Sequence, residues 1–297
     1  MAATARLVLD AKNIVGESLI WVADHAAFFW VDIGGKSISM FRPCDGHFET
    51  WPTPDFPTSI GCRKDGGFIV GLTRDVCLWE PGDIFEPVAT PEPEFPCNRL
   101  NEGVVAPDGS FWVGTMDNNL DADGSPKEQS AKSGAYYRID PDFSVHRLTP
   151  NEYGITNTMG WLPGGRFVTA DTIANTLYQF DIGADGGLSN RRVFVEGFER
   201  GLPDGSCVDA EGFLWNCRVV GGACVARFSP SGALERVVEL PCSWPTSCAF
   251  GGSDLTTLYV TSARLTMSEG NLAANPQEGG LFAVDAGARG LLPNLFG

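Results

Sequence analysis

The sequence predicts an all-β protein, a six-bladed β-propeller whose four-stranded antiparallel blades surround a central channel. The first observation is the composition: the chain has 36 Gly, 20 Pro, 8 Trp and 19 Phe, and it lacks long stretches of Ala, Glu, Lys and Leu. Such a mixture is typical of many short strands joined by tight turns. The second is a repeat, in which a turn with Asp, Pro or Gly precedes an aromatic residue and an alternating apolar strand. Its copies stand about 40 to 55 residues apart, a period typical of propeller blades.

The repeat occurs six times along the chain. Clear copies occupy residues 64–71 (KDGGFIVG), 107–114 (PDGSFWVG), 163–170 (PGGRFVTA) and 209–215 (DAEGFLW), and degenerate copies occupy 24–32 and 253–260. A second alternating strand follows, for example at residues 37–43, 135–141, 176–181, 225–230 and 280–285. Alternation with a period of two marks half-buried antiparallel strands, and the Gly, Asp and Pro clusters between them supply the turns.

Six copies fill one closed ring, so we predict a single domain over residues 1–297 without an internal boundary. Residues 117–133 are rich in Asn, Asp, Gly, Ser and Lys, and this composition predicts a long exposed loop. A large β-sandwich is the alternative all-β fold, and the regular period of the repeat disfavours it.

The chain is strongly acidic, with 37 Asp and Glu against 21 Lys and Arg and a formal net charge of −16. It therefore lacks the positive surface that neutralises phosphates, which argues against nucleic acid as a partner. The same charge disfavours docking on anionic membranes. Acidity favours the capture of cations, although most of these carboxylates are expected to be solvated surface charges.

Nine cysteines occur, an odd number, without a C-x-x-C pair or a His at zinc-finger spacing. Most have apolar neighbours, as Cys207 and Cys224 do, and are interpreted as small buried side chains, reduced and without a catalytic role. Because a disulfide framework is unexpected in so large a chain, a reducing compartment is predicted. Residues 1–9 lack the apolar core and cleavage site of a targeting segment, and no apolar run is long enough to span a membrane. We expect a soluble, cytoplasmic protein.

Conventional catalytic motifs are scarce. The three histidines, His25, His47 and His146, lie in polar turns or strand tips. The chain has no G-x-S-x-G elbow, no H-E-x-x-H helix, no Walker motif and no G-x-G-x-x-G between a strand and a helix. These absences argue against serine hydrolysis, phosphoryl transfer and hydride transfer.

Oxygen-donor residues remain where strands begin or end, namely Glu17, Asn157 and Asp204. Each has a simpler explanation when it is taken alone. Glu17 fits a solvated edge charge, and Asn157 fits a turn residue that bonds its own backbone. Asp204 precedes Gly205, as in an ordinary hairpin turn.

A series of motifs in one order changes this interpretation. They occupy residues 16–21 (GESLIW), 98–103 (NRLNEG), 111–116 (FWVGTM), 156–161 (TNTMGW), 203–209 (PDGSCVD), 246–252 (TSCAFGG), 258–264 (LYVTSAR) and 279–282 (GGLF). With these motifs the chain resembles the regucalcin/gluconolactonase family of six-bladed propellers from about residue 15 to residue 290. The resemblance implies one divalent cation in the central channel, held by Glu17, Asn157 and Asp204 from different blades.

The resemblance also implies substrate-binding residues, with Arg99 and Asn101 holding substrate oxygens. In some members an acidic residue just past the Gly-Thr-Met motif touches substrate as well. Here Asp117 follows that motif directly, while Asn119 aligns with the family's Glu, so both are candidates. The simpler alternative for Arg99 is a surface arginine paired with Glu94 or Glu102, and such exposed ion pairs contribute little to stability.

Two further positions depart from the family's pattern. Thr158 follows Asn157 where members often have Gly, which could narrow the site beside the cation. The opening motif is Gly-Glu-Ser-Leu, so that Ser18 stands where Gly is commoner, although Glu17 itself is kept.

Two carboxylates and one amide oxygen make a hard oxygen site that suits calcium, magnesium, manganese or ferrous iron, with zinc less favoured. A cation held in this way can polarise an ester carbonyl and activate water, while Arg99 and Asn101 orient sugar hydroxyls. Asp204 is the candidate catalytic base.

These inferences predict hydrolysis of a small-molecule sugar lactone, an aldono-1,4- or 1,5-lactone, to the open aldonic acid. The enzyme would be a carboxylic ester hydrolase similar to gluconolactonase or xylonolactonase, and a monomer or a weak homo-oligomer. Hydrolysis of organophosphates or other activated esters at the same site is one alternative. A calcium-binding regulatory protein without turnover is the other.

Overall fold

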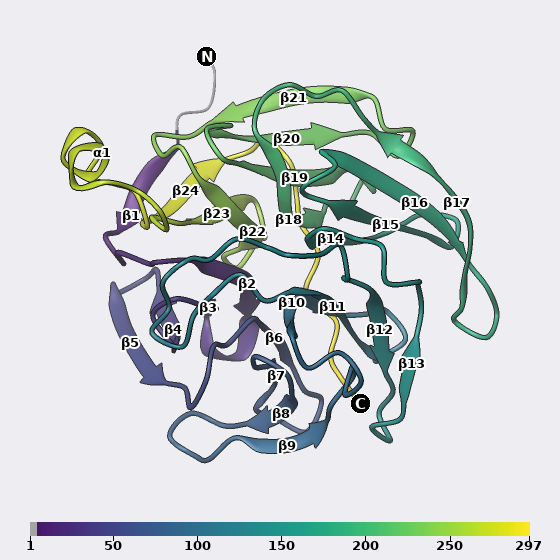
Figure 1. The fold of residues 1–297 in the computed structure, drawn as a ribbon. Coiled ribbons are helices and arrows are strands. Elements are labelled where there is room, and N and C mark those ends of the chain that lie inside the picture. Colours follow the sequence, from purple (N-terminus) through teal and green to yellow (C-terminus); the bar gives the residue numbers. More distant parts are fainter. Residues whose placement is uncertain (1–4) are drawn as a thin grey trace.

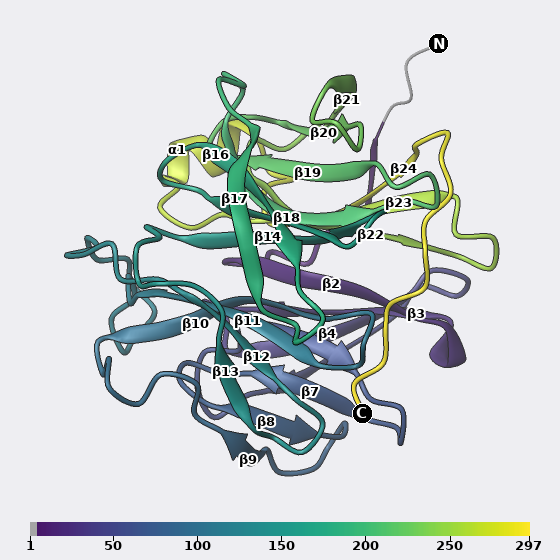
Figure 2. The ribbon, with the colours of Figure 1, turned by 90° about the vertical axis from the view of Figure 1, so that its right-hand side faces the viewer.

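Six four-stranded antiparallel sheets stand in a ring around a central channel in the computed structural model, which describes residues 5–297 (Figure 1). The prediction of a six-bladed propeller is thereby confirmed. The first four residues of the predicted 1–297 domain lie outside the described residues. In the view turned by 90°, the last part of the chain, after residue 285, runs along one end of the ring of sheets (Figure 2).

Five blades begin at their innermost strand and continue outward in chain order, and the sixth does so except for its outermost strand, which comes from the start of the chain. The first blade comprises β2 (Gly16–Val22), β3 (Ala27–Asp32), β4 (Ser37–Arg42) and β5 (His47–Pro52), and the second comprises β6 (Ser59–Cys62), β7 (Phe68–Gly71), β8 (Val76–Trp79) and β9 (Glu86–Ala89). The third comprises β10 (Asn98–Val105), β11 (Phe111–Asp117), β12 (Tyr136–Ile139) and β13 (Val145–Arg147), and the fourth comprises β14 (Thr156–Leu162), β15 (Arg166–Asp171), β16 (Thr176–Ile182) and β17 (Leu188–Val195). The fifth comprises β18 (Leu202–Val208), β19 (Leu214–Val219), β20 (Cys224–Phe228) and β21 (Leu234–Glu239), and the sixth comprises β22 (Pro245–Gly251), β23 (Thr257–Ser262), β24 (Leu281–Asp285) and β1 (Arg6–Leu9).

The six copies of the sequence repeat are the second strands of the blades, preceded by their turns. The aromatic position is fully buried in several copies, as in Phe28, Phe111 and Phe167. The glycines serve the turn: Gly66 and Gly67 have φ of 91° and 66°, a left-handed conformation that suits residues without Cβ. The repeat therefore encodes one turn and one buried strand in every blade.

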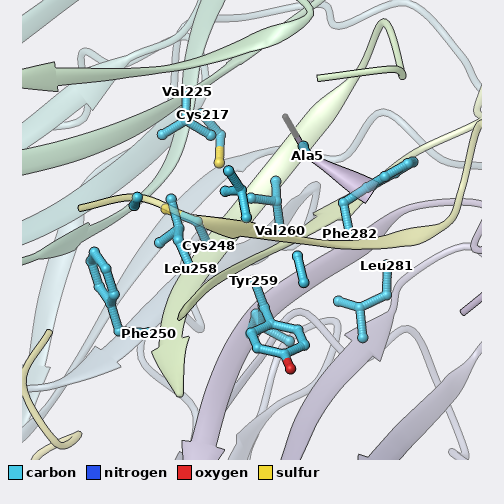
Figure 3. Close-up of a cluster of buried hydrophobic side chains, with 14 of the residues drawn as sticks. Ala5, Cys217, Val225, Cys248, Phe250, Leu258, Tyr259, Val260, Leu281 and Phe282 are labelled. Carbon is cyan, nitrogen blue, oxygen red and sulfur yellow. The ribbon is translucent and has the colours of Figure 1, made fainter. Parts of the chain in front are cut away.

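The apolar core lies between neighbouring blades. Its largest cluster joins the fifth, sixth and first blades, with Trp215 on β19, Phe250 on β22 and Phe28 on β3. Figure 3 shows part of this cluster, including Phe250. Trp215 and Phe250 pack edge to face with ring centroids 5.6 Å apart. Aromatic packing of this kind holds successive blades at a fixed angle and leaves the inner strands to line the channel.

The ring closes through its termini. β1 pairs with β24 and supplies the outermost strand of the sixth blade. Beyond β24 the chain crosses one end of the channel, where Gly290 forms a bridge with Asp209 and Phe296 forms one with Arg63. This segment therefore connects the fifth blade to the second.

The remaining irregular segments are a short helix and one long loop. Helix α1 (Glu269–Ala274), which the sequence analysis does not predict, lies between β23 and β24 and has Ser268 as its N-cap. The loop predicted over residues 117–133 is present between β11 and β12, and most of its residues are exposed. Among the described residues no helix is long and apolar enough to cross a membrane.

Candidate cation and substrate site

Irregularities in the inner strands aim three of the predicted residues into the channel. The register of β2 against β3 shifts between Glu17 and Ile20, and that of β14 against β15 shifts just after Asn157. The register of β18 against β19 shifts between Pro203 and Ser206, a segment that contains Asp204. Such bulges turn side chains out of the regular alternation of a strand. Three blades therefore present an oxygen donor at one end of the channel.

These donors line a cavity of about 330 Å³ at that end. Its polar lining includes Glu17, Arg99, Asn101, Asn119, Asn157 and Asp204. Apolar residues such as Val15, Ile155 and Trp244 form much of its wall. Six of the seven predicted site residues therefore share one concave site, at the lower end of the usual size for small-molecule pockets.

The two carboxylates in this cavity are buried, and the charge of each is influenced by the other. Burial raises the pKa of Glu17 well above its ordinary value, and the negative charges of Asp204 and Glu102 raise it further. Burial also raises the pKa of Asp204, although a hydrogen bond with Glu17 and the charge of Arg218 oppose this rise. No salt bridge neutralises either carboxylate within residues 5–297. The charges of Arg218 and Arg99 therefore act on the pair without a direct ion pair.

Asn157 is oriented to offer oxygen to the cavity. Its amide nitrogen donates to the hydroxyl of Thr172 at 3.0 Å, and Thr172 in turn donates to the carbonyl of Pro203. The amide oxygen receives only a long contact, of 3.5 Å, from the amide nitrogen of Asn101, and it keeps a lone pair for a ligand. Two carboxylates without a salt bridge and one oriented amide oxygen fit a hard divalent cation. The described residues contain no cluster of three or more His, Cys, Asp and Glu side chains suited to a metal, so the fit depends on the amide.

Arg99 organises the substrate-binding candidates. It is 6% exposed, and its guanidinium donates to the side-chain oxygen of Asn101 at 2.8 Å and to that of Asn119 at 3.0 Å. Burial lowers the pKa of Arg99 to about 10, so it stays charged at neutral pH. No ion pair with Glu94 or Glu102 occurs in the described chain, which argues against the alternative of a surface pair.

Asp117 lies outside this cavity. Its carboxylate accepts hydrogen bonds from the backbone N–H of Ser130, from the Ser130 hydroxyl at 2.9 Å and from the N–H of Ala131 at 3.2 Å. These bonds hold residues 130 and 131, at the C-terminal side of the loop, in place. The N-terminal side of the same loop carries Asn119, which lines the cavity. Of the two candidates past the Gly-Thr-Met motif, the structure places Asn119 beside Arg99 and Asp117 at the base of the loop.

Comparison with known proteins shows the family of this chain. Residues 15–264 match the family model described as the SMP-30/gluconolactonase/LRE-like region. The chain belongs to this family. It is 31% identical to 6-deoxy-6-sulfogluconolactonase of Pseudomonas putida, covering 100% of this chain and 99% of that protein. It is also 31% identical to L-arabinolactonase of Azospirillum brasilense, over 99% of this chain and 96% of the relative.

A solved structure extends the comparison to the fold. The calcium-binding protein regucalcin of Agrobacterium tumefaciens superposes with a TM-score of 0.90 at 25% identity, covering 100% of this chain and 98% of the other.

Within the SMP-30/gluconolactonase/LRE-like family, the two departures noted in the sequence have a common structural basis. Ser18 and Thr158 each directly follow a proposed cation ligand, and their φ values of 54° and 57° are left-handed. Glycine adopts this conformation without a steric penalty. This chain has hydroxyl side chains there instead, and both are used. The Ser18 hydroxyl accepts a hydrogen bond from the N–H of Ile60 at 2.9 Å, and Thr158 bonds the fifth blade.

Glu102, a buried carboxylate that the sequence analysis did not assign to the site, lines a separate cavity of the channel and influences the two candidate carboxylates by its charge. It is 8% exposed on β10, and its Oε2 has no hydrogen-bond partner among the described residues. Burial and the charge of Asp204 raise its pKa well above the ordinary value. The register of β10 against β11 shifts between Leu100 and Gly103, so Glu102 leaves the regular alternation. No feature of the sequence around Glu102 marks this carboxylate as buried.

Proposed function

We propose that this protein hydrolyses a sugar lactone to the open aldonic acid, with one divalent cation held by Glu17, Asn157 and Asp204. The observation that carries the proposal is the meeting of two buried carboxylates, an oriented amide oxygen and a buried arginine in one cavity. The lactonase names of two full-length relatives support the class of reaction. The calcium-binding description of the solved relative supports a cation.

The substrate would be oriented by the network around Arg99. Its guanidinium aligns the side chains of Asn101 and Asn119, and together they offer donors and acceptors to ring hydroxyls. Asn101 is held from the other side because its amide nitrogen donates to the carbonyl of Thr156 at 2.8 Å. Such preorganisation lowers the entropic part of the barrier.

The chemistry requires water to attack the lactone carbonyl carbon. A divalent cation at this site supplies a positive charge that stabilises negative charge on the carbonyl oxygen. Asp204 accepts the proton of the attacking water at a carboxylate oxygen. The ring C–O bond then breaks and the departing ring oxygen takes up a proton, so that lactone and water give the hydroxy acid. No covalent intermediate with the protein is needed.

Cation removal and substrate panels test the proposal. Chelation with EDTA should abolish lactone hydrolysis, and one equivalent of a divalent cation per chain should restore it. Pentono- and hexonolactones should be cleaved faster than phosphotriesters, the substrates of the alternative hydrolase. Full activity in protein shown by elemental analysis to be metal-free would contradict the cation. Absence of turnover on every lactone, with cation binding intact, would favour the calcium-binding regulatory alternative.

A further inference from the structure

A cluster of three thiols lies between the fifth and sixth blades, on the side of the channel away from the proposed cation site. The sulfur atoms of Cys207 on β18 and Cys248 on β22 are 3.7 Å apart. Cys217 on β19 belongs to the same packed cluster, where Figure 3 shows its sulfur beside that of Cys248. Because β18 and β22 are inner strands of different sheets, no ladder of hydrogen bonds joins them.

We propose that Cys207 and Cys248 are an oxidisable pair, which a hydroperoxide converts into a disulfide linking the fifth blade to the sixth. A disulfide has an S–S distance of about 2.05 Å, so bond formation draws the two sulfur atoms together by about 1.6 Å from their present separation of 3.7 Å. Both side chains end in the same space, and the sulfur atoms already touch at van der Waals distance.

The pair is accessible to a small oxidant. Cys207 and Cys248 both line a second cavity of about 220 Å³, which opens at the opposite end of the channel from the cation site. The C-terminal residues Leu291 and Leu292 lie at the mouth of this cavity, where each is more than half exposed. Hydrogen peroxide is only slightly larger than water, which occupies about 30 Å³, so a cavity of this size admits it.

The surroundings favour reaction at Cys248. Hydrogen bonds from Cys207 and Cys217 lower the pKa of the Cys248 thiol, against the effect of burial. The thiolate is the nucleophilic form of cysteine. The Cys248 sulfur attacks one peroxide oxygen and the O–O bond breaks, which gives a sulfenic acid and hydroxide. The sulfur of Cys207 then attacks the sulfenic sulfur, an S–S bond forms, and the S–O bond breaks. The thiol protons leave in two waters, so that two thiols lose two electrons and one peroxide gains them.

The disulfide would change the proposed cation site, because both cysteines lie next to residues that position the cation ligands. Ser206, next to Cys207, contacts the hydroxyl of Thr158 at 3.0 Å, and Thr158 bonds the carbonyl of Asp204. On the other strand, Thr246 lies two residues before Cys248 and its hydroxyl donates to the carbonyl of Gly16, directly before Glu17. Drawing the sulfur atoms together therefore pulls on both carboxylate ligands. Loss of such supporting contacts weakens cation binding by about 10- to 100-fold.

Peptide mapping after oxidation tests the pair directly. The reduced full-length protein should titrate close to nine free thiols in denaturant, the number of cysteines in the chain. After hydrogen peroxide and alkylation, one cross-linked peptide should join Cys207 to Cys248, and dithiothreitol should reverse it. The exposed Cys44 and Cys97 provide the matched control, because the C44S/C97S variant should form the same cross-link. The C217S variant should form it as well, whereas C207S should leave Cys248 as a sulfinic acid.

Cation binding provides the second readout, with Mn²⁺ as the probe. The oxidised protein should bind Mn²⁺ about 10- to 100-fold more weakly than the reduced protein, and reductant should restore the affinity. Absence of the Cys207–Cys248 peptide from the oxidised wild type would overturn the pair, as would a cross-link from Cys217 in its place. Unchanged Mn²⁺ affinity in the cross-linked protein would overturn its link to the cation site. If the reduced protein binds no Mn²⁺ at all, the proposed function fails, while the peptide map still decides the disulfide.

Discussion

The side-chain hydroxyl of Thr158 donates a hydrogen bond of 2.6 Å to the backbone carbonyl of Asp204, and so ties the fourth blade to the fifth beside the proposed cation site. Asn216 donates to the same carbonyl at 3.1 Å. The backbone of Asp204 is therefore positioned from two sides by buried polar groups. Its side chain receives its direction from this arrangement as well as from the bulge in β18.

Replacing Thr158 by Val should weaken cation binding by about 10- to 100-fold, the usual effect of removing a group that supports a ligand. Valine keeps the shape and the β-branch of threonine but cannot donate to Asp204, which is then held by Asn216 alone. Isothermal titration with Mn²⁺ measures the change. Thr158→Ser, which keeps the hydroxyl, is the matched control and should bind within about threefold of wild type. Equal affinity in both variants would mean that this hydrogen bond does not orient the ligand.

Arg99→Ala should separate substrate orientation from cation binding. Arg99 carries no negative charge, so cation content should stay unchanged, while kcat/KM should fall by roughly 10- to 1,000-fold through the loss of charge-assisted hydrogen bonds. Arg99→Lys keeps the charge but lacks the planar fork that reaches Asn101 and Asn119 together, and it should also be impaired.

Asp204→Ala is the comparison for these two variants, because it should lose almost all turnover and retain cation poorly. Lactone hydrolysis and bound metal are measured for all three. Normal kcat/KM in Arg99→Ala would remove this arginine from the substrate site.

The sequence predicted the architecture because each blade carries its own local signal. A turn and an aromatic strand such as residues 107–114 can be recognised without knowing what they pack against. The closure of the ring could not be predicted in the same way. β1 lacks the turn and aromatic residue of the repeat, and its partner β24 lies at the other end of the chain.

For the candidate site, the sequence indicates which residues to consider but not how they converge. Glu17, Asn157 and Asp204 follow from the resemblance, but their convergence depends on bulges whose left-handed positions carry Ser18 and Thr158, where no glycine marks them. A buried carboxylate such as Glu102 has no local signature, because its burial comes from other blades.

Asp117 is expected to act on substrate through the loop that it fastens. Asp117→Asn keeps one acceptor oxygen but places an amide nitrogen beside the donors of Ser130 and Ala131, so the cavity wall that carries Asn119 should loosen. KM should rise about 10-fold with little change in cation affinity, since the ligands lie on other strands. Steady-state kinetics and Mn²⁺ titration measure the two effects. Asp123→Asn is the control, because Asp123 caps only the exposed turn at Ser125 in the same loop. An unchanged KM in Asp117→Asn would show that the loop does not shape the substrate site.

Cation binding should release protons near neutral pH. In the cation-free protein, burial together with the charges of Asp204 and Glu102 raises the pKa of Glu17, and burial raises the pKa of Asp204 to about 7. A carboxyl whose pKa is raised on folding binds more protons in the folded state, so its contribution to stability is present below the unfolded pKa of about 4 and is lost as pH rises toward 7. A cation reverses this loss because it requires the ionised form.

Two measurements test this pH dependence of stability and of cation binding. The Tm of chelated protein should fall between pH 5 and pH 8, and the rise in Tm on adding Mn²⁺ should grow over the same interval. Calorimetric titration in buffers of different ionisation enthalpy should show release of about one proton per cation at pH 6.5. The exposed Asp142, whose pKa is lowered by its hydrogen bonds with Ser144, provides the control, because Asp142→Asn should leave the proton count unchanged. A binding enthalpy that does not depend on the buffer would contradict a protonated carboxyl in the cation-free site.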